Sequence, residues 1–149
     1  MRDQRQEWSF QVGRGKGIPD FDFSPDGQSL VTAGRDHTVR IWDAETSELK
    51  QTFLGHTAPV WHVAFSRDGK TVASCSADTT IKLWDLQNSK LRATLKRHTK
   101  DVNEVEYSPD GKTLASCSDD GTIKIWDPMT GQERFTLTGH TDIVGGLAF

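Results

Sequence analysis

The sequence predicts an all-β fold in which one four-stranded antiparallel unit repeats along the chain. The evidence is a set of landmarks that recur every 42 residues without an insertion. They are Trp42-Asp43, Trp84-Asp85 and Trp126-Asp127, the histidines His56, His98 and His140, and the Asp-Gly pairs at 26–27, 68–69 and 110–111. A fixed period of 20–50 residues is typical of repeat architectures, and no segment has the 3.6-residue period of a helix.

The second unit shows how each strand is predicted. Residues 60–65 are β-branched and aromatic and therefore favour a strand. Asp68-Gly69 ends it, because glycine supplies the positive φ that a tight hairpin needs. Further strands are expected at 71–76, where small residues suit burial on both faces, at 81–84 and at 91–95. Four strands make one unit.

The other units copy this pattern. Their expected strands are 21–23, 29–33, 38–42 and 49–53 in unit one, and 102–107, 113–117, 122–126 and 134–137 in unit three. Residues 143–149 align with the first strand of a fourth unit, and the alternation of Trp8, Phe10 and Val12 predicts one edge strand before the first. The expected organisation is an N-terminal segment at 1–12, repeats at 13–54 (with an irregular start), 55–96 and 97–138, and a truncated repeat at 139–149.

Units of this length with Gly-His and Trp-Asp landmarks are typical of the blades of a β-propeller. Closed propellers hold roughly 4–8 blades. Three full repeats and a partial one therefore predict an open arc, unless more chain or a second subunit completes the ring. An open sheet edge also makes self-association possible.

Composition excludes several classes of function. The net charge of −3 and pI of about 5.9 provide no basic surface for nucleic acid. A mean hydropathy of −0.59 without a long apolar run argues against a membrane span, and the N-terminus does not resemble a signal peptide. We therefore expect a cytoplasmic protein. Cys75 and Cys117 occupy the slot of Ala33 in unit one, so they are interpreted as small packed side chains without metal or disulfide chemistry.

With these landmarks the chain resembles the WD-repeat β-propellers over about residues 8–149. The resemblance implies a buried hydrogen-bonded tetrad in each blade. The tetrad residues are His56, Ser74, Asp78 and Trp84 in unit two, His98, Ser116, Asp120 and Trp126 in unit three, and Thr32, Asp36 and Trp42 in unit one, where Arg14 replaces the histidine. Such groups are costly to bury alone and can satisfy one another. His, Asp and Ser together also suggest a catalytic triad, but their recurrence in successive units favours a structural role.

The resemblance also implies a partner-binding face with three positions in each blade. The candidate protein-binding residues are Arg35, Pro59, Trp61, Asp101, Asn103 and Asp119, and the equivalent positions elsewhere are Gly17, Pro19, Ala77, Ile143 and Gly145. Trp61 is the outlier, because its equivalents are Pro19, Asn103 and Gly145. Two interpretations stay open: Trp61 is an interface anchor beside Arg35 and a carboxylate pair, or it packs between blades with Val63 and Phe65.

Other candidates have less support. Residues 13–17 resemble a glycine-rich phosphate loop, but a strand follows where such a loop needs a helix. His62 is interpreted as a surface residue, and the pair Glu104 and Glu106 as solvated on an outer strand face. We therefore expect no catalytic residue, no metal site and no cofactor.

The predicted function is that of a non-catalytic scaffold for protein–protein interaction, within a longer propeller. An alternative is the regulatory or sensor region of a larger signalling enzyme, such as a kinase or nucleotide-hydrolysing protein. Fold alone does not identify a partner.

Overall fold

The computed structural model describes residues 17–149. The strand predicted at Trp8 to Val12, and Arg14, lie outside this part of the chain. The described residues form three separate four-stranded antiparallel sheets, called blades one, two and three. No helix in this part of the chain is long and apolar enough to cross a membrane.

The strands of each blade follow one another in sequence order. Blade one holds β1 (Phe21–Phe23), β2 (Ser29–Ala33), β3 (Val39–Asp43) and β4 (Leu49–Phe53). Blade two holds β5 (Val60–Phe65), β6 (Thr71–Ser76), β7 (Ile81–Asp85) and β8 (Lys90–Leu95). Blade three holds β9 (Val102–Tyr107), β10 (Leu114–Ser118), β11 (Ile123–Trp126) and β12 (Glu133–Leu137). Every boundary lies within one residue of its prediction.

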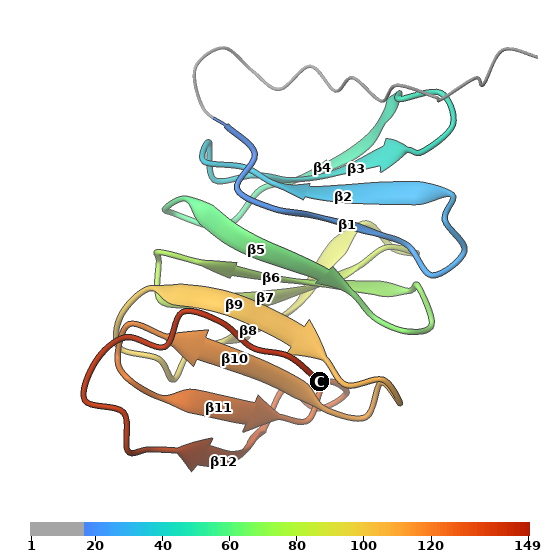
Figure 1. The fold of residues 1–149 in the computed structure, drawn as a ribbon. Helices are drawn as coiled ribbons and strands as arrows, with labels where there is room; N and C mark the ends of the chain where they lie inside the picture. Colours follow the sequence, from blue (N-terminus) through green and yellow to red (C-terminus); the bar gives the residue numbers. More distant parts are fainter. Residues whose placement is uncertain (1–16) are drawn as a thin grey trace, which may run out of the picture.

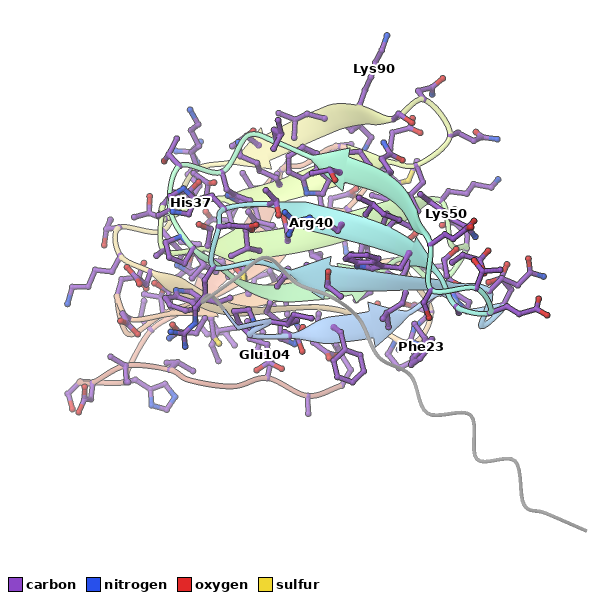
Figure 2. All side chains as sticks on the ribbon, turned by 90° about the horizontal axis from the view of Figure 1, so that it is seen from above. Phe23, His37, Arg40, Lys50, Lys90 and Glu104 are labelled. Carbon is purple, nitrogen blue, oxygen red and sulfur yellow. The ribbon has the colours of Figure 1, made fainter. Side chains whose placement is uncertain are left out.

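The blades stack as an arc that does not close into a ring (Figure 1). The first strands β1, β5 and β9 are neighbours across blade boundaries, and together they form the inner side of the arc. Each blade then fans outward to its fourth strand. In Figure 2, Glu104 of β9 and Lys90 of β8 accordingly lie at opposite edges of the stack.

One expected strand is not formed. Residues 143–149 form no strand, although Val144 N–H donates to the carbonyl of Ser118 at 3.2 Å and Leu147 N–H donates to Glu104 Oε2 at 2.7 Å. The segment thus follows the edge of blade three without a ladder. A ladder needs a paired second strand, and no strand in residues 17–149 pairs with it.

The hydrophobic core is divided between the two blade boundaries. One cluster joins β2 and β3 of blade one to Val63, Phe65 and Trp84 of blade two, and a second joins blade two to blade three. The second strands are the most buried, because they lie between two neighbouring sheets: every residue of β6 and β10 is buried. Cys75 and Cys117 are free, buried thiols in these strands, in agreement with their interpretation as small packed side chains.

Each Asp-Gly pair forms the turn between first and second strands. Gly27, Gly69 and Gly111 have φ values of 70°, 68° and 69°, in the left-handed region that the hairpin turn requires. The aspartate before each glycine accepts a 2.6 Å hydrogen bond from the hydroxyl of the serine two residues earlier. The three turns are therefore nearly identical.

Candidate functional site

The predicted tetrad residues of blade two meet in one buried network. His56 Nδ1 lies 2.7 Å from Asp78 Oδ2, and His56 Nε2 lies 2.8 Å from Ser74 Oγ. Trp84 Nε1–H donates to the same serine oxygen at 2.8 Å. The histidine comes from the segment before β5, so the network ties that segment to β6, β7 and the turn between them.

Blade three repeats this geometry. His98 lies 2.9 Å from Asp120 and 2.8 Å from Ser116, and Trp126 donates to Ser116 at 2.9 Å. In blade one, Trp42 donates to Thr32 at 2.9 Å, while Asp36 bonds Arg40.

Protonation in this network follows from burial and hydrogen bonds. Burial lowers the pKa of His98 below its usual range, against the opposing effect of Asp120. Burial raises the pKa of Asp120, but hydrogen bonds from Thr122, the Thr99 amide and His98 outweigh it and hold that pKa well below the usual range. The favoured state pairs a neutral imidazole with an ionised carboxylate.

This arrangement differs from a catalytic triad in one decisive respect. Ser74 and Ser116 are both 0 % exposed, and each Oγ already accepts the tryptophan N–H. A nucleophilic serine must reach a substrate. The geometry therefore supports a structural role.

The six candidate protein-binding residues lie together at one end of the blades, which we call the Trp61 face (Arg35, Pro59, Trp61, Asp101, Asn103 and Asp119). Trp61 Nε1–H donates to Asp101 Oδ2 of blade three at 3.3 Å. The guanidinium of the exposed Arg35, from blade one, lies 5.7 Å from the centre of the Trp61 ring. One side chain therefore contacts residues from all three blades.

The rest of the Trp61 face is linked by hydrogen bonds. Asn103 Nδ2 donates to Asp119 Oδ1 at 2.7 Å and to the Val144 carbonyl at 3.0 Å. Asp119 N–H donates to the carbonyl of Asp101 at 3.0 Å, and the Pro59 carbonyl accepts the Ser76 hydroxyl at 2.8 Å.

Bulges explain why these positions point out of the sheet. The pairing of β5 with β6 skips Trp61, and the pairing of β9 with β10 skips Asn103. A bulge redirects the side chain of the extra residue. Trp61 is half-buried and packs against the core between blades two and three, which differs from the expected packing with Val63 and Phe65 in the other cluster.

The interpretations of His62, Glu104 and Glu106 were wrong. They predicted solvated surface side chains, yet all three are half-buried on the inner strands β5 and β9. His62 Nε2 lies 3.5 Å from Asp20 Oδ2 and 3.6 Å from Glu104 Oε1. Burial, together with the charge of Glu104, raises the pKa of Glu106. The alternation of one strand does not reveal whether that strand lies inside or outside its blade.

The ligand atoms of His62, Glu104 and Glu106 lie within 4.8 Å of one another, and these residue types suit a divalent cation. The carboxylates of this region already have a role, however. Asp20 accepts Val63 N–H at 3.0 Å and Glu104 accepts Leu147 N–H at 2.7 Å, so each bridges to the next inner segment. The sequence analysis did not predict this bridging. Its one sequence signal is a spacing of 43 residues between each carboxylate and the amide that it accepts.

The comparisons with known proteins agree with this architecture. The family model "WD domain, G-beta repeat" matches residues 8–43, 47–85 and 89–127. The chain therefore belongs to the WD40 repeat family, and both the predicted family and the all-β fold are confirmed.

The chain also resembles individual proteins over part of their length. It is 40 % identical over 63 residues to "Protein TOPLESS" of Arabidopsis thaliana, covering 41 % of this chain and 6 % of that protein. It is 53 % identical over 34 residues to "WD repeat-containing protein pop1" of Schizosaccharomyces pombe, covering 23 % of this chain and 4 % of that protein. The chain thus spans less than a tenth of the length of these relatives.

Two solved structures share the fold over most of the chain. "Structure of U3-55K" has a TM-score of 0.84 at 25 % identity, and "Crystal structure of RRP9 WD40 repeats" has a TM-score of 0.84 at 26 % identity. Each match covers 89 % of this chain and 42 % of the other.

Proposed function

We propose that the chain acts as a non-catalytic WD40 scaffold that binds a protein partner through the Trp61 face. The observation that carries this proposal is the contact of Trp61 with Arg35 on one side and Asp101 on the other. WD40 repeats are usually non-catalytic scaffolds that bind proteins, so the family supports the same class of function.

The physical chemistry of Trp61 suits an anchor for a partner. Tryptophan and arginine are enriched among the residues that dominate the binding energy of protein interfaces, and tryptophan buries a large area at a small cost in conformational entropy. Here the ring is held in place by a neighbouring carboxylate and a cation before any partner arrives. Such preorganisation lowers the entropic cost of binding.

A peptide-display selection on the purified chain tests this proposal. Selected peptides should lose at least about tenfold in affinity on Trp61→Ala, the loss expected of an interface hot spot. The matched control is Lys90→Ala, an exposed residue at the start of β8 on the outer edge of the stack (Figure 2). Peptides whose affinity falls equally with both variants, or with neither, would contradict binding at the Trp61 face.

We further propose that these blades belong to a longer propeller and self-associate when isolated. Phe21 and Phe23 of β1 are 59 % and 43 % exposed, on a sheet face without a neighbouring blade in residues 17–149. In sedimentation velocity, the weight-average sedimentation coefficient of the 149-residue chain should increase with protein concentration. A monodisperse monomer would contradict self-association.

No observation in the described residues favours the alternative function, the regulatory region of a signalling enzyme, which stays a prediction.

A further inference from the structure

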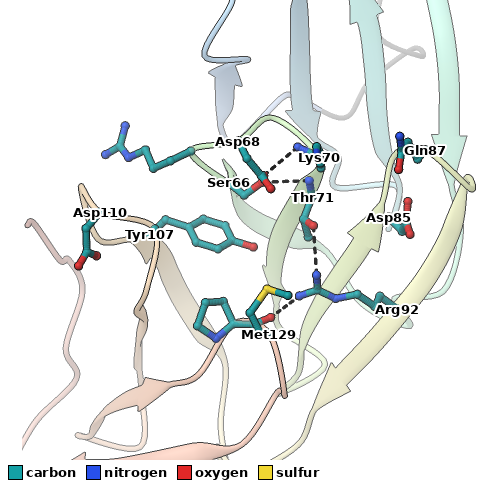
Figure 3. A pocket seen from close by; sticks show the side chains of 13 residues that line it. Ser66, Asp68, Lys70, Thr71, Asp85, Gln87, Arg92, Tyr107, Asp110 and Met129 are labelled. Carbon is teal, nitrogen blue, oxygen red and sulfur yellow. Dashed lines mark hydrogen bonds between the residues drawn. The ribbon is translucent and has the colours of Figure 1, made fainter.

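A pocket of about 470 Å³ lies between blades two and three (Figure 3). It is lined by the turn that follows β5, whereas Trp61 lies near the start of that strand. Its walls come from the turn between β5 and β6, from β8, from the end of β9 and from the turn after β11. The lining includes the side chains of Thr71, Arg92, Tyr107 and Met129. The volume falls in the range of small-ligand sites.

Tyr107 departs from the repeat in this pocket. The equivalent residues in the other units are Phe23, Phe65 and Phe149, so the blade packs there without a hydroxyl. Tyr107 is only 4 % exposed and its hydroxyl has no hydrogen-bond partner. Figure 3 shows that hydroxyl pointing toward the wall formed by Thr71 and Arg92. A buried hydroxyl without a partner costs free energy, so its presence points to a ligand.

Arg92 is a second, independent departure in the same pocket. In units one and three the equivalent cation pairs with the aspartate of Trp-Asp, as Lys50 with Asp43 and Arg134 with Asp127, each at 2.8 Å. Arg92 makes no such pair.

The local contacts show what Arg92 does instead. Asp85 accepts a 2.8 Å hydrogen bond from the side chain of Asn88. The guanidinium of Arg92 donates to Thr71 Oγ1 at 3.3 Å, as Lys50 does to Ser29 and Arg134 to Thr113, but it also donates to the carbonyl of Pro128 in blade three. Arg92 therefore bonds across the blade boundary at the pocket instead of pairing with Asp85.

The boundary between blades one and two provides an internal comparison. The equivalent pocket there has a volume of about 200 Å³, and its lining includes Phe65 and Leu86 where the larger pocket has Tyr107 and Pro128. Leu86 N–H bonds the carbonyl of Lys70 at 3.0 Å, whereas proline has no N–H to donate. The enlarged, donor-lined pocket is thus particular to one boundary.

The donors indicate the chemistry of the ligand. Burial raises the pKa of Tyr107, so its hydroxyl stays a donor. A guanidinium has five N–H donors, and Arg92 makes two hydrogen bonds. A tyrosine hydroxyl and a guanidinium fork together suit an anionic acceptor.

The surrounding charges disfavour an anion that carries more than one charge. The lining holds three cationic and three acidic side chains, namely Arg67, Lys70 and Arg92, and Asp68, Asp85 and Asp110. This balance disfavours a phosphate dianion. We propose that the pocket binds the carboxylate of a small, partly apolar organic acid or chain terminus, with Tyr107 and Arg92 as its donors.

Benzoate provides a direct test, because methionine methyl groups report on the pocket. The chain has two methionines, Met1 and Met129, so ¹³C-methyl labelling gives two signals that Met129→Leu assigns. Benzoate should shift the Met129 signal saturably at pH 7. Tyr107→Phe restores the residue of the other units and should therefore fold, yet it should weaken binding about tenfold. Phe65→Tyr in the smaller pocket is the matched control and should leave benzoate binding unchanged.

Further arms separate the sources of the carboxylate. An acetyl-Gly-Phe peptide with a free carboxylate is compared with benzoate and with its own C-terminal amide. Tighter binding of the free peptide assigns a chain terminus, whereas tighter binding of benzoate assigns a free organic acid, and in both cases the amide should bind at least tenfold more weakly. The proposal is overturned by a shift that stays linear, by unchanged affinity in Tyr107→Phe, or by stronger binding of inorganic phosphate.

Discussion

Blade one differs from blades two and three in how it holds the aspartate of its tetrad. In all three blades the tryptophan N–H donates to a hydroxyl of the second strand, at 2.9 Å in blade one and 2.8 Å in blade two. The side chain of Asp36 is 32 % exposed and bonds Arg40, whereas that of Asp78 is 7 % exposed and bonds His56. The tryptophan–hydroxyl bond therefore needs only residues of its own sheet and forms in every blade. The aspartate is deeply buried in the blade where it pairs with a histidine.

The largest effect is expected where the network and the core coincide. Trp84→Ala should lower the free energy of unfolding by about 3–5 kcal/mol, the cost of truncating a buried aromatic residue. Trp84 is 2 % exposed and its ring lies 5.0 Å from that of Phe53 across the blade boundary. Urea denaturation measures the change. An equal loss in Trp61→Ala would place Trp61 in the core and remove it from the proposed binding surface.

The histidine contributes less than the tryptophan. His98→Ala should lower the free energy of unfolding by about 1–3 kcal/mol, because Asp120 and Ser116 lose a buried partner. His140 occupies the same repeat position but is exposed, so His140→Ala is the matched control and should leave the urea midpoint unchanged. A midpoint that is unaffected by His98→Ala would show that the network does not stabilise the blade.

The same histidine predicts how stability depends on pH. The pKa of His98 is lowered from 6.5 by burial, so the unfolded chain binds the proton more readily than the folded chain. Its contribution to stability is therefore complete above about pH 6.5 and is lost as the pH falls below that value. Asp120, whose pKa is also lowered, adds a second loss below about pH 3.8. The urea midpoint should fall between pH 7.5 and 5.5, and the fall should be smaller in His98→Gln. Parallel profiles for the two proteins would exclude His98 as the titrating group.

The fold was predictable from the sequence because strand identity and period are local properties. The landmarks Gly-His, Asp-Gly and Trp-Asp fixed the spacing, and the alternation within each unit located the strands. The strand predicted at residues 143–149 is not formed, because a strand requires a pairing partner as well as a suitable sequence. The prediction that His62 and Glu104 are solvated was wrong, because the sequence of a single strand does not show whether that strand lies on the inner or outer side of its blade.

The two departures that shape the pocket were unequally visible. Tyr107 stands among phenylalanines when the units are aligned, so this departure is as visible in the sequence as Trp61. The redirection of Arg92 cannot be read in this way, since Arg134 is also an arginine and does pair with its aspartate. In blade two the side chain of Asn88 donates a hydrogen bond to Asp85, in place of the cation. Competition between hydrogen-bond partners appears only in three dimensions.

The smallest effect is expected at Asp36, the half-buried aspartate of blade one. Asp36→Ala should lower the free energy of unfolding by less than about 1 kcal/mol, because a partly exposed ion pair gains little over its solvated partners. Asp78→Ala should cost about 1–3 kcal/mol, since it removes the partner of the buried Nδ1 of His56. Salt distinguishes the two further: 1 M NaCl should reduce the Asp36 effect by screening its ion pair and leave the Asp78 effect largely intact. Equal losses in urea denaturation would mean that the histidine does not determine how strongly a blade depends on its aspartate, and the contrast between blade one and the others would then be one of exposure alone.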